Sequence, residues 1–94
     1  MDNLLKGFLR SDHAGEVGAV YIYKGILKIA KDPELVNFSK RHLATEESHL
    51  QKIEGVLPKK DRSKLVWLWK VAGFLLGFLP VSYTHLTLPT ILLV

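Results

Sequence analysis

The sequence predicts an all-α fold with three helices, because apolar residues recur at helical spacing in segments that turn residues separate. Apolar side chains recur every three or four positions at about residues 2–31 and again at about 33–56. A third segment, at about 63–79, is apolar on nearly every face. The chain has 94 residues, which is enough for one small domain of marginal stability.

Turn residues set the boundaries between these helices. Asp32 is a good N-cap for the second helix, and Pro33 fits the first turn, where its missing N–H costs nothing. Pro58 ends the second helix. Residues 59–64 contain four basic side chains and predict a linker that leads to the third helix.

Three residues of types that bind metals occupy positions where a helix would place apolar side chains. Glu16 continues the apolar stripe of the first segment, and Glu46 and His49 lie within the stripe of the second. Carboxylates are rarely buried unless they are paired or bind a metal. The stripes include Leu5, Phe8, Val20, Tyr23 and Leu27 in the first segment, and Leu35, Phe38, Leu50, Ile53 and Leu57 in the second.

The spacing of these residues favours one shared metal centre. Residues three apart project from the same side of a helix, so Glu46 and His49 can reach the same ion or ion pair. Carboxylate and imidazole together suit iron or manganese. Ferritin-like bundles build di-metal sites from one Glu on each of two helices and Glu-x-x-His on each of two others. This chain supplies one of each kind.

Three blocks of sequence are distinctive: LRSDHAGEVGA at 9–19 followed by IYKG at 22–25, HLATEESHL at 42–50, and LWKVAGFLLG at 68–77. In this order they resemble the demethoxyubiquinone hydroxylase family of di-iron monooxygenases. The resemblance implies a ferritin-like antiparallel helix bundle, truncated here to about three helices, the N-terminal half of that fold.

This resemblance also implies an activity and a set of ligands. The expected reaction is oxygen-dependent hydroxylation of a demethoxyquinol ring in ubiquinone biosynthesis, with two iron ions as cofactor. Glu16 would be a terminal ligand, Glu46 a bridging carboxylate and His49 an imidazole ligand. Asp12 and Tyr23 flank Glu16 at helical spacing and would orient the metal ligands without binding the metal themselves.

The second half of that ligand set is absent from the sequence. Asp61 is the only acidic residue after Glu54, so no later segment can supply a second Glu and Glu-x-x-His. Residues 81–94 lose helical periodicity, are rich in Thr and β-branched residues and contain Pro89. They resemble a translated sequencing-adapter tail, and we expect them to be non-native. We therefore expect this chain alone to be inactive.

The third helix bears on localisation. Leu65 to Leu79 is too short to cross a bilayer alone, but Trp67 and Trp69 beside the basic linker suit a headgroup boundary. A buried bundle helix fits the composition equally well. The family resemblance favours a peripheral protein on the cytoplasmic face of a bacterial inner membrane. The expected membrane or quinone contacts are Leu65, Trp67, Trp69, Phe74 and Leu75.

We expect the remaining histidines and glutamates of the first two helices to have structural roles rather than to bind metal. We expect His13 at the surface or bundle end, and His42 as a partly exposed helical residue rather than a ligand. Glu47 and Glu54 would form a solvated face with neighbouring lysines.

Composition narrows the partners and leaves two alternatives. Given the resemblance to a family with a lipid-soluble quinone substrate, we interpret the net charge of +4 as attraction to a membrane rather than to nucleic acid, for which no motif is present. Cysteine is absent, which excludes disulfides and thiolate ligands. No signal or transit segment precedes Leu4, as expected for a chain made in the bacterial cytosol or for a mature form. In one alternative, the chain is an iron-binding half-bundle that dimerises. In the other, it is a membrane-surface helical module without metal.

Overall fold

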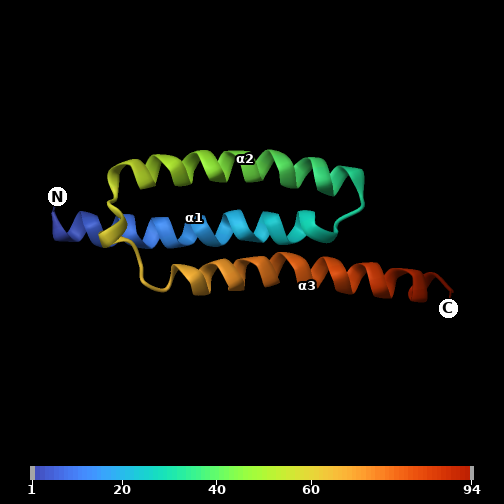
Figure 1. Ribbon diagram of the computed structural model, residues 1–94. Helices are drawn as coiled ribbons and strands as arrows, with labels where there is room; N and C mark the ends of the chain where they lie inside the picture. Colours follow the sequence, from blue (N-terminus) through green and yellow to red (C-terminus); the bar gives the residue numbers. More distant parts are fainter. Residues whose placement is uncertain (1, 94) are drawn as a thin grey trace.

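Three long helices lie side by side in the structure, with the first between the other two (Figure 1). The computed structural model describes the backbone of residues 2–93 and the side chains of residues 2–83. The helices are α1 (Asn3–Ile29), α2 (Pro33–Val56) and α3 (Val66–Leu93), with a single 3₁₀ turn, η1 (Lys59–Asp61), between α2 and α3. The all-α class predicted from the sequence is confirmed.

Side-chain caps begin the first two helices. The Asp2 carboxylate accepts a hydrogen bond from the Leu4 backbone N–H at 2.9 Å, and Asp32 accepts one from Glu34 N–H at 3.3 Å. Pro33 occupies the first turn of α2, as its sequence context predicts. At the other end of α2, Leu57 closes the helix, and the chain reverses direction through η1. The turn at residues 30–32 likewise reverses the chain between α1 and α2, so α2 runs antiparallel to both α1 and α3 (Figure 1).

Helix α3 is longer than the sequence predicts. Its expected range was about 63–79, but it begins at Val66 and continues to Leu93. The expected loss of helix after Pro80 is wrong for the backbone. A proline costs a growing helix one hydrogen bond and a steric clash, whereas continuing an established helix is otherwise cooperative. Whether residues 81–94 are native stays a prediction.

Glycines let α1 and α3 approach until their backbones touch. A Cβ added at Gly73 would meet the carbonyl oxygen of Gly18, and one added at Gly77 would meet that of Ile22. On the opposing helix, a Cβ at Gly25 would lie 2.9 Å from a backbone nitrogen of α3. Gly73 and Gly77 form a Gly-x-x-x-Gly pair, the spacing by which membrane helices pack closely.

The hydrophobic core is small, and the molecule is elongated. The chain measures 59 × 22 × 16 Å with a radius of gyration of 16.3 Å, whereas a compact domain of this length would have about 12 Å. The buried apolar side chains are Ala14, Val17, Val20 and Leu57. Val17 and Val20 lie where residues of all three helices come together. Leu5, Phe8 and Phe38 of the predicted stripes are exposed.

The outer face of α3 is apolar and open to solvent. Residues Val66–Tyr83 are long and apolar enough to cross a membrane by length and composition, and little of this segment is buried. The expectation that helix three is too short to cross is therefore wrong as an argument from length. The exposed apolar side chains on this helix include Trp67, Leu68, Val71, Leu75, Leu76 and Leu79.

Candidate metal centre

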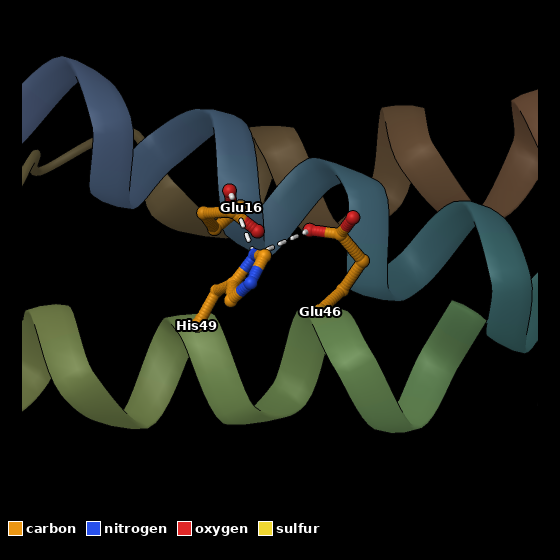
Figure 2. Close-up of side chains that lie close together, drawn as sticks. All are labelled: Glu16, Glu46 and His49. Carbon is orange, nitrogen blue, oxygen red and sulfur yellow. Dashed lines mark ion pairs between the residues drawn. The ribbon is translucent and has the colours of Figure 1, made fainter. Parts of the chain in front are cut away.

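Helices α1 and α2 bring the three sequence-predicted ligands together. Glu16 points from α1 toward α2, and Glu46 and His49 point from α2 toward α1 (Figure 2). One ligand atom from each residue lies within 4.8 Å of the other two. His49 Nδ1 lies 3.9 Å from Glu16 Oε1 and 3.9 Å from Glu46 Oε2. Among the described residues, this is the only such group of three.

Local helix geometry and helix register both contribute to this arrangement. The i, i+3 spacing places Glu46 and His49 on one face of α2. The three-residue turn between α1 and α2 then brings Glu16 opposite that face. Further along the same seam, the rings of Tyr23 and His42 are stacked with centroids 5.7 Å apart. The antiparallel register therefore holds over at least two turns on this side of the cluster.

The histidine of the cluster is more exposed than the two glutamates, so the site is open on the His49 side. The Glu16 and Glu46 side chains are 25% and 23% exposed, and the His49 side chain is 50% exposed. Glu16 Oε2 is buried and has no hydrogen-bond partner among the described residues. An unsatisfied buried acceptor is costly, and a bound cation would satisfy it. The donor set therefore fits a metal ion.

Glu16 has an unusual protonation equilibrium. Its pKa is raised from about 4.5 to about 7, first because Glu46 hydrogen-bonds the protonated carboxyl and then because burial disfavours the charged form. Repulsion from the charges of Glu46 and Asp12 raises the pKa further. A cation bound beside Glu16 would favour its charged form and offset these effects.

Asp12 and Tyr23, which are expected to orient the metal ligands, lie in different surroundings. Asp12 is exposed and acts on Glu16 through its charge. Tyr23 packs against the rings of Phe38 and His42, with centroids 6.4 Å and 5.7 Å away. His42 is exposed and its ring stacks on that of Tyr23; that it is not a ligand stays a prediction. An orienting role for Asp12 or Tyr23 stays a prediction.

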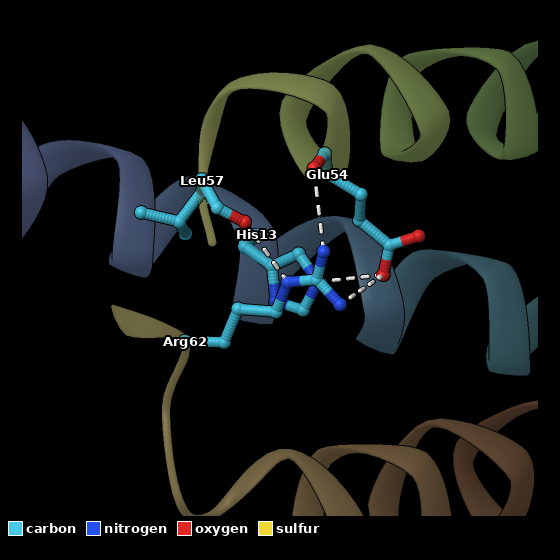
Figure 3. A network of polar contacts seen from close by, with 4 residues as sticks. All are labelled: His13, Glu54, Leu57 and Arg62. Carbon is cyan, nitrogen blue, oxygen red and sulfur yellow. Dashed lines mark hydrogen bonds and ion pairs between the residues drawn. The ribbon is translucent and has the colours of Figure 1, made fainter. Parts of the chain in front are cut away.

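A polar cluster one turn from Glu16 contradicts two expectations. The expectation for His13 is a position at the surface or the bundle end, but it is only 2% exposed, and its Nε2 donates to Glu54 Oε2 at 2.9 Å. Glu54 was expected on a solvated face, but it also pairs with Arg62 Nη1 at 3.6 Å. Arg62 reaches back from the linker to donate to the backbone carbonyls of Leu57 and Glu54 (Figure 3).

Contacts between helices explain both differences from the sequence-based expectations. His13 lies on the buried side of α1, together with Ala14 and Val17. Its partner is 41 residues away, and helical spacing alone could not identify it. The local signal was the position of His13 one turn before Glu16, on the inward side of the helix.

The expected membrane or quinone contacts divide into two groups. Leu65, Trp67 and Leu75 are exposed. Trp69 is 47% exposed, but its ring also lies 3.7 Å from the Cβ position of Gly18 on α1. Phe74 is only half-buried; it stacks on Phe78 at 5.8 Å, and its backbone abuts Gly25 on α1. A membrane or quinone contact on the surface of α3 would therefore involve Leu65, Trp67 and Leu75.

Comparison with known proteins shows similarity to enzymes of ubiquinone biosynthesis. The family model described as ubiquinone biosynthesis protein COQ7 matches residues 3–85. A protein of Rhodospirillum rubrum named 3-demethoxyubiquinol 3-hydroxylase is 43% identical over 77 residues, which cover 79% of this chain and 36% of that protein. A protein of Dictyostelium discoideum named NADPH-dependent 3-demethoxyubiquinone 3-hydroxylase, mitochondrial, is 30% identical over 77 residues, which cover 80% of this chain and 36% of that protein.

The extent of these matches is limited. The chain spans about a third of the length of the curated relatives that it matches. No solved structure matches the chain significantly.

Proposed function

The chain belongs to the family described as ubiquinone biosynthesis protein COQ7, and we propose that it forms part of a hydroxylase that acts on a demethoxyquinol ring. The observation that carries this proposal is the convergence of Glu16, Glu46 and His49 within 4.8 Å across the α1–α2 seam. Such a ligand set is typical of ferritin-like di-metal proteins.

Iron is the proposed cofactor, two ions for a complete site. Iron bound there would supply the activation of dioxygen that ring hydroxylation requires. The residues of this chain would supply the binding face. With a pKa of about 7, Glu16 is protonated in part of the molecules at neutral pH, and these would release the proton on metal binding, because carboxylates bind metals in their charged form. The half-exposed His49 leaves one side of the cluster open to a further ligand or a substrate.

The ligand count implies that this chain alone forms half of a site. A ferritin-like centre uses four Glu and two His, and the chain contributes two Glu and one His. A second Glu and Glu-x-x-His must come from another polypeptide segment, either of a longer protein or of a second copy. We accordingly propose that the isolated chain does not hydroxylate quinols.

Membrane association is part of the same proposal. The open apolar face of α3 and the net charge of +4 favour peripheral binding to an anionic surface, on the cytoplasmic side of a bacterial inner membrane. A demethoxyquinol with an isoprenoid tail would be taken from that membrane. Trp67 and Leu75 would lie on the lipid side.

Metal binding is tested by anaerobic reconstitution with ferrous iron, measured as iron per chain. We expect bound iron in the unmodified chain and its loss in Glu46→Ala and His49→Ala. Glu47→Ala is the matched control, because Glu47 is an exposed neighbour outside the cluster. Equal iron binding by all four proteins would contradict the proposed ligands.

The activity is tested in a chimera. The 77 matched residues of the Rhodospirillum rubrum protein are replaced by those of this chain, and conversion of a demethoxyquinol is followed by chromatography. We expect the chimera to hydroxylate the quinol and its Glu46→Ala variant to be inactive. A folded, iron-loaded chimera without activity would contradict the proposed function.

A homodimer is the second candidate, favoured by the exposure of His49 and by the single ligand set. Two copies would together supply all six ligands. Sedimentation with and without ferrous iron tests this. We expect iron to convert the unmodified chain, but not His49→Ala, to a dimer. An iron-loaded monomer would exclude this candidate.

A further inference from the structure

A hollow with several basic residues lies between the helices and the linker. Its volume is about 480 Å³, and residues of α1, α2, the linker and α3 line it. Glu16, Glu46 and His49 are not among these residues. Its basic residues come from three parts of the chain, namely Lys24 of α1, Lys59 and Arg62 of the linker and Lys70 of α3.

Two of these lysines converge on one aromatic ring. The Nζ atoms of Lys24 and Lys70 lie 4.6 Å and 5.7 Å from the centroid of the Tyr21 ring. Both are at cation–π distance, although they come from different helices. Neither has a carboxylate within 4.0 Å among the described residues. An anion bound beside this ring would be attracted by both ammonium charges.

The other charged residues of the hollow leave its charge positive. Arg62 is already paired with Glu54, which also accepts from His13. Lys59 has no ion pair among the described residues and adds a third free ammonium group. Glu47 is the remaining acid, on the α2 wall. An anionic ligand is therefore favoured on the side formed by α1 and α3.

Lys70 belongs both to the hollow and to α3, the helix with the exposed apolar face. It is the only Lys, Arg, Asp or Glu in α3, and its Nζ lies over a ring of α1. Trp67, Leu75 and Leu76 are exposed elsewhere on the same helix. If that exposed surface enters a bilayer with α3 lying along it, α1 lies above α3 (Figure 1). Lys70 and Lys24 then lie at the depth of the headgroups.

We propose that Lys24, Lys59 and Lys70 bind the phosphate of an anionic phospholipid headgroup in this hollow. Three ammonium groups offer the donors that a phosphate oxygen accepts, and they come from segments far apart in the sequence. The adjoining apolar surface favours a lipid over free phosphate, because the acyl chains can contact α3 while the headgroup reaches the lysines. This inference rests on the proposed membrane association, but not on the metal centre or on the proposed reaction.

The test is vesicle binding of the full chain, followed by the fluorescence of its two tryptophans. Vesicles of phosphatidylcholine alone are compared with vesicles that contain about 30% phosphatidylglycerol, at near-physiological ionic strength of about 0.15 M. The test variant is Lys24→Gln/Lys70→Gln. A Lys24→Arg/Lys70→Arg variant keeps both charges. The matched control is Lys31→Gln/Lys40→Gln, which removes the same charge from exposed positions outside the hollow.

We expect the Gln test variant to bind phosphatidylglycerol vesicles at least about tenfold more weakly, the Arg variant to recover most of the affinity, and the control to lose less than about threefold. Binding to phosphatidylcholine alone should be the same in all four proteins. Circular dichroism checks the fold. If the double Gln variant unfolds, Lys59→Gln takes its place, since η1 is outside the helices.

Two outcomes would overturn the proposal. An equal loss in the test and control variants would show that only net charge attracts the chain to the membrane. Inorganic phosphate provides the second arm, titrated without vesicles and then as a competitor. If it binds the chain through the same lysines and displaces it from vesicles, the ligand is free phosphate rather than a lipid.

Discussion

His13 and Glu54 join α1 to the end of α2 through a hydrogen bond of 2.9 Å between His13 Nε2 and Glu54 Oε2. His13 precedes the proposed ligand Glu16 by one helical turn, and Glu54 follows His49 by little more than one. Arg62 joins the same carboxylate to the linker (Figure 3). This bond therefore links α1 to α2 about one helical turn from the place where Glu16 faces His49.

Removing the buried imidazole should destabilise the chain. We expect His13→Ala to lower the free energy of unfolding by about 2–3 kcal/mol, because a buried hydrogen bond and side-chain volume are both lost. Glu54→Gln should cost about 1 kcal/mol, since the amide can still accept a bond. Urea unfolding followed by circular dichroism measures both. Glu47→Gln on the exposed side of α2 should change little, and an equal loss there would argue against a specific link.

Adding a methyl group between α1 and α3 should have a large effect. In Gly77→Ala the new Cβ would meet the backbone of Ile22, so we expect a loss of about 2–3 kcal/mol in the free energy of unfolding. Gly55→Ala is the matched control, because no atom lies within 4 Å of its Cβ position. That change should stabilise α2 by about 0.5–1 kcal/mol. Similar unfolding midpoints for the two variants would contradict the close helix contact.

The stability of the metal-free chain should fall as the pH rises through the range in which Glu16 titrates. The folded chain holds the Glu16 proton more tightly than the unfolded chain, since the pKa of this carboxyl is raised to about 7. Its contribution is therefore present at low pH and is lost between about pH 4.5 and 7. Partial exposure reduces the effect to about 1–2 kcal/mol.

Urea unfolding at several pH values measures this dependence. Glu16→Gln should remove that part of the slope, whereas Glu47→Gln should keep it. Asp12→Asn should shift the fall to lower pH, because the Asp12 charge contributes to the raised pKa of Glu16. A pH profile unchanged in Glu16→Gln would show that Glu16 is not the titrating group.

The apolar surface of α3 should contribute to membrane binding without contributing to the fold. Leu76 is 65% exposed, so Leu76→Gln should leave the unfolding free energy nearly unchanged. Its binding to phosphatidylcholine vesicles should weaken several-fold, through loss of about 1–2 kcal/mol of apolar burial. Leu4→Gln is the control, with 67% exposure at the far end of α1. Equal binding by the two variants would place the membrane contact elsewhere.

Much of the local structure could be predicted from the sequence. The Asp32–Pro33 pair marks the start of α2, and the i, i+3 spacing of Glu46 and His49 places both on one face. Their meeting with Glu16 required only an antiparallel hairpin with a short turn. The end of α3 could not be predicted in this way, because the helix continues through Pro80, a residue that usually ends a helix.

The sequence by itself determined the three helices, the caps and the residues that can bind a metal, because these depend on side chains close together along the chain. The tertiary structure decided which faces of the helices meet. It buried His13 against Glu54, pressed Gly73 and Gly77 onto α1, and brought Lys24 and Lys70 to one ring. These contacts depend on the register and separation of helices that are distant in sequence, and helical periodicity carries no information about either.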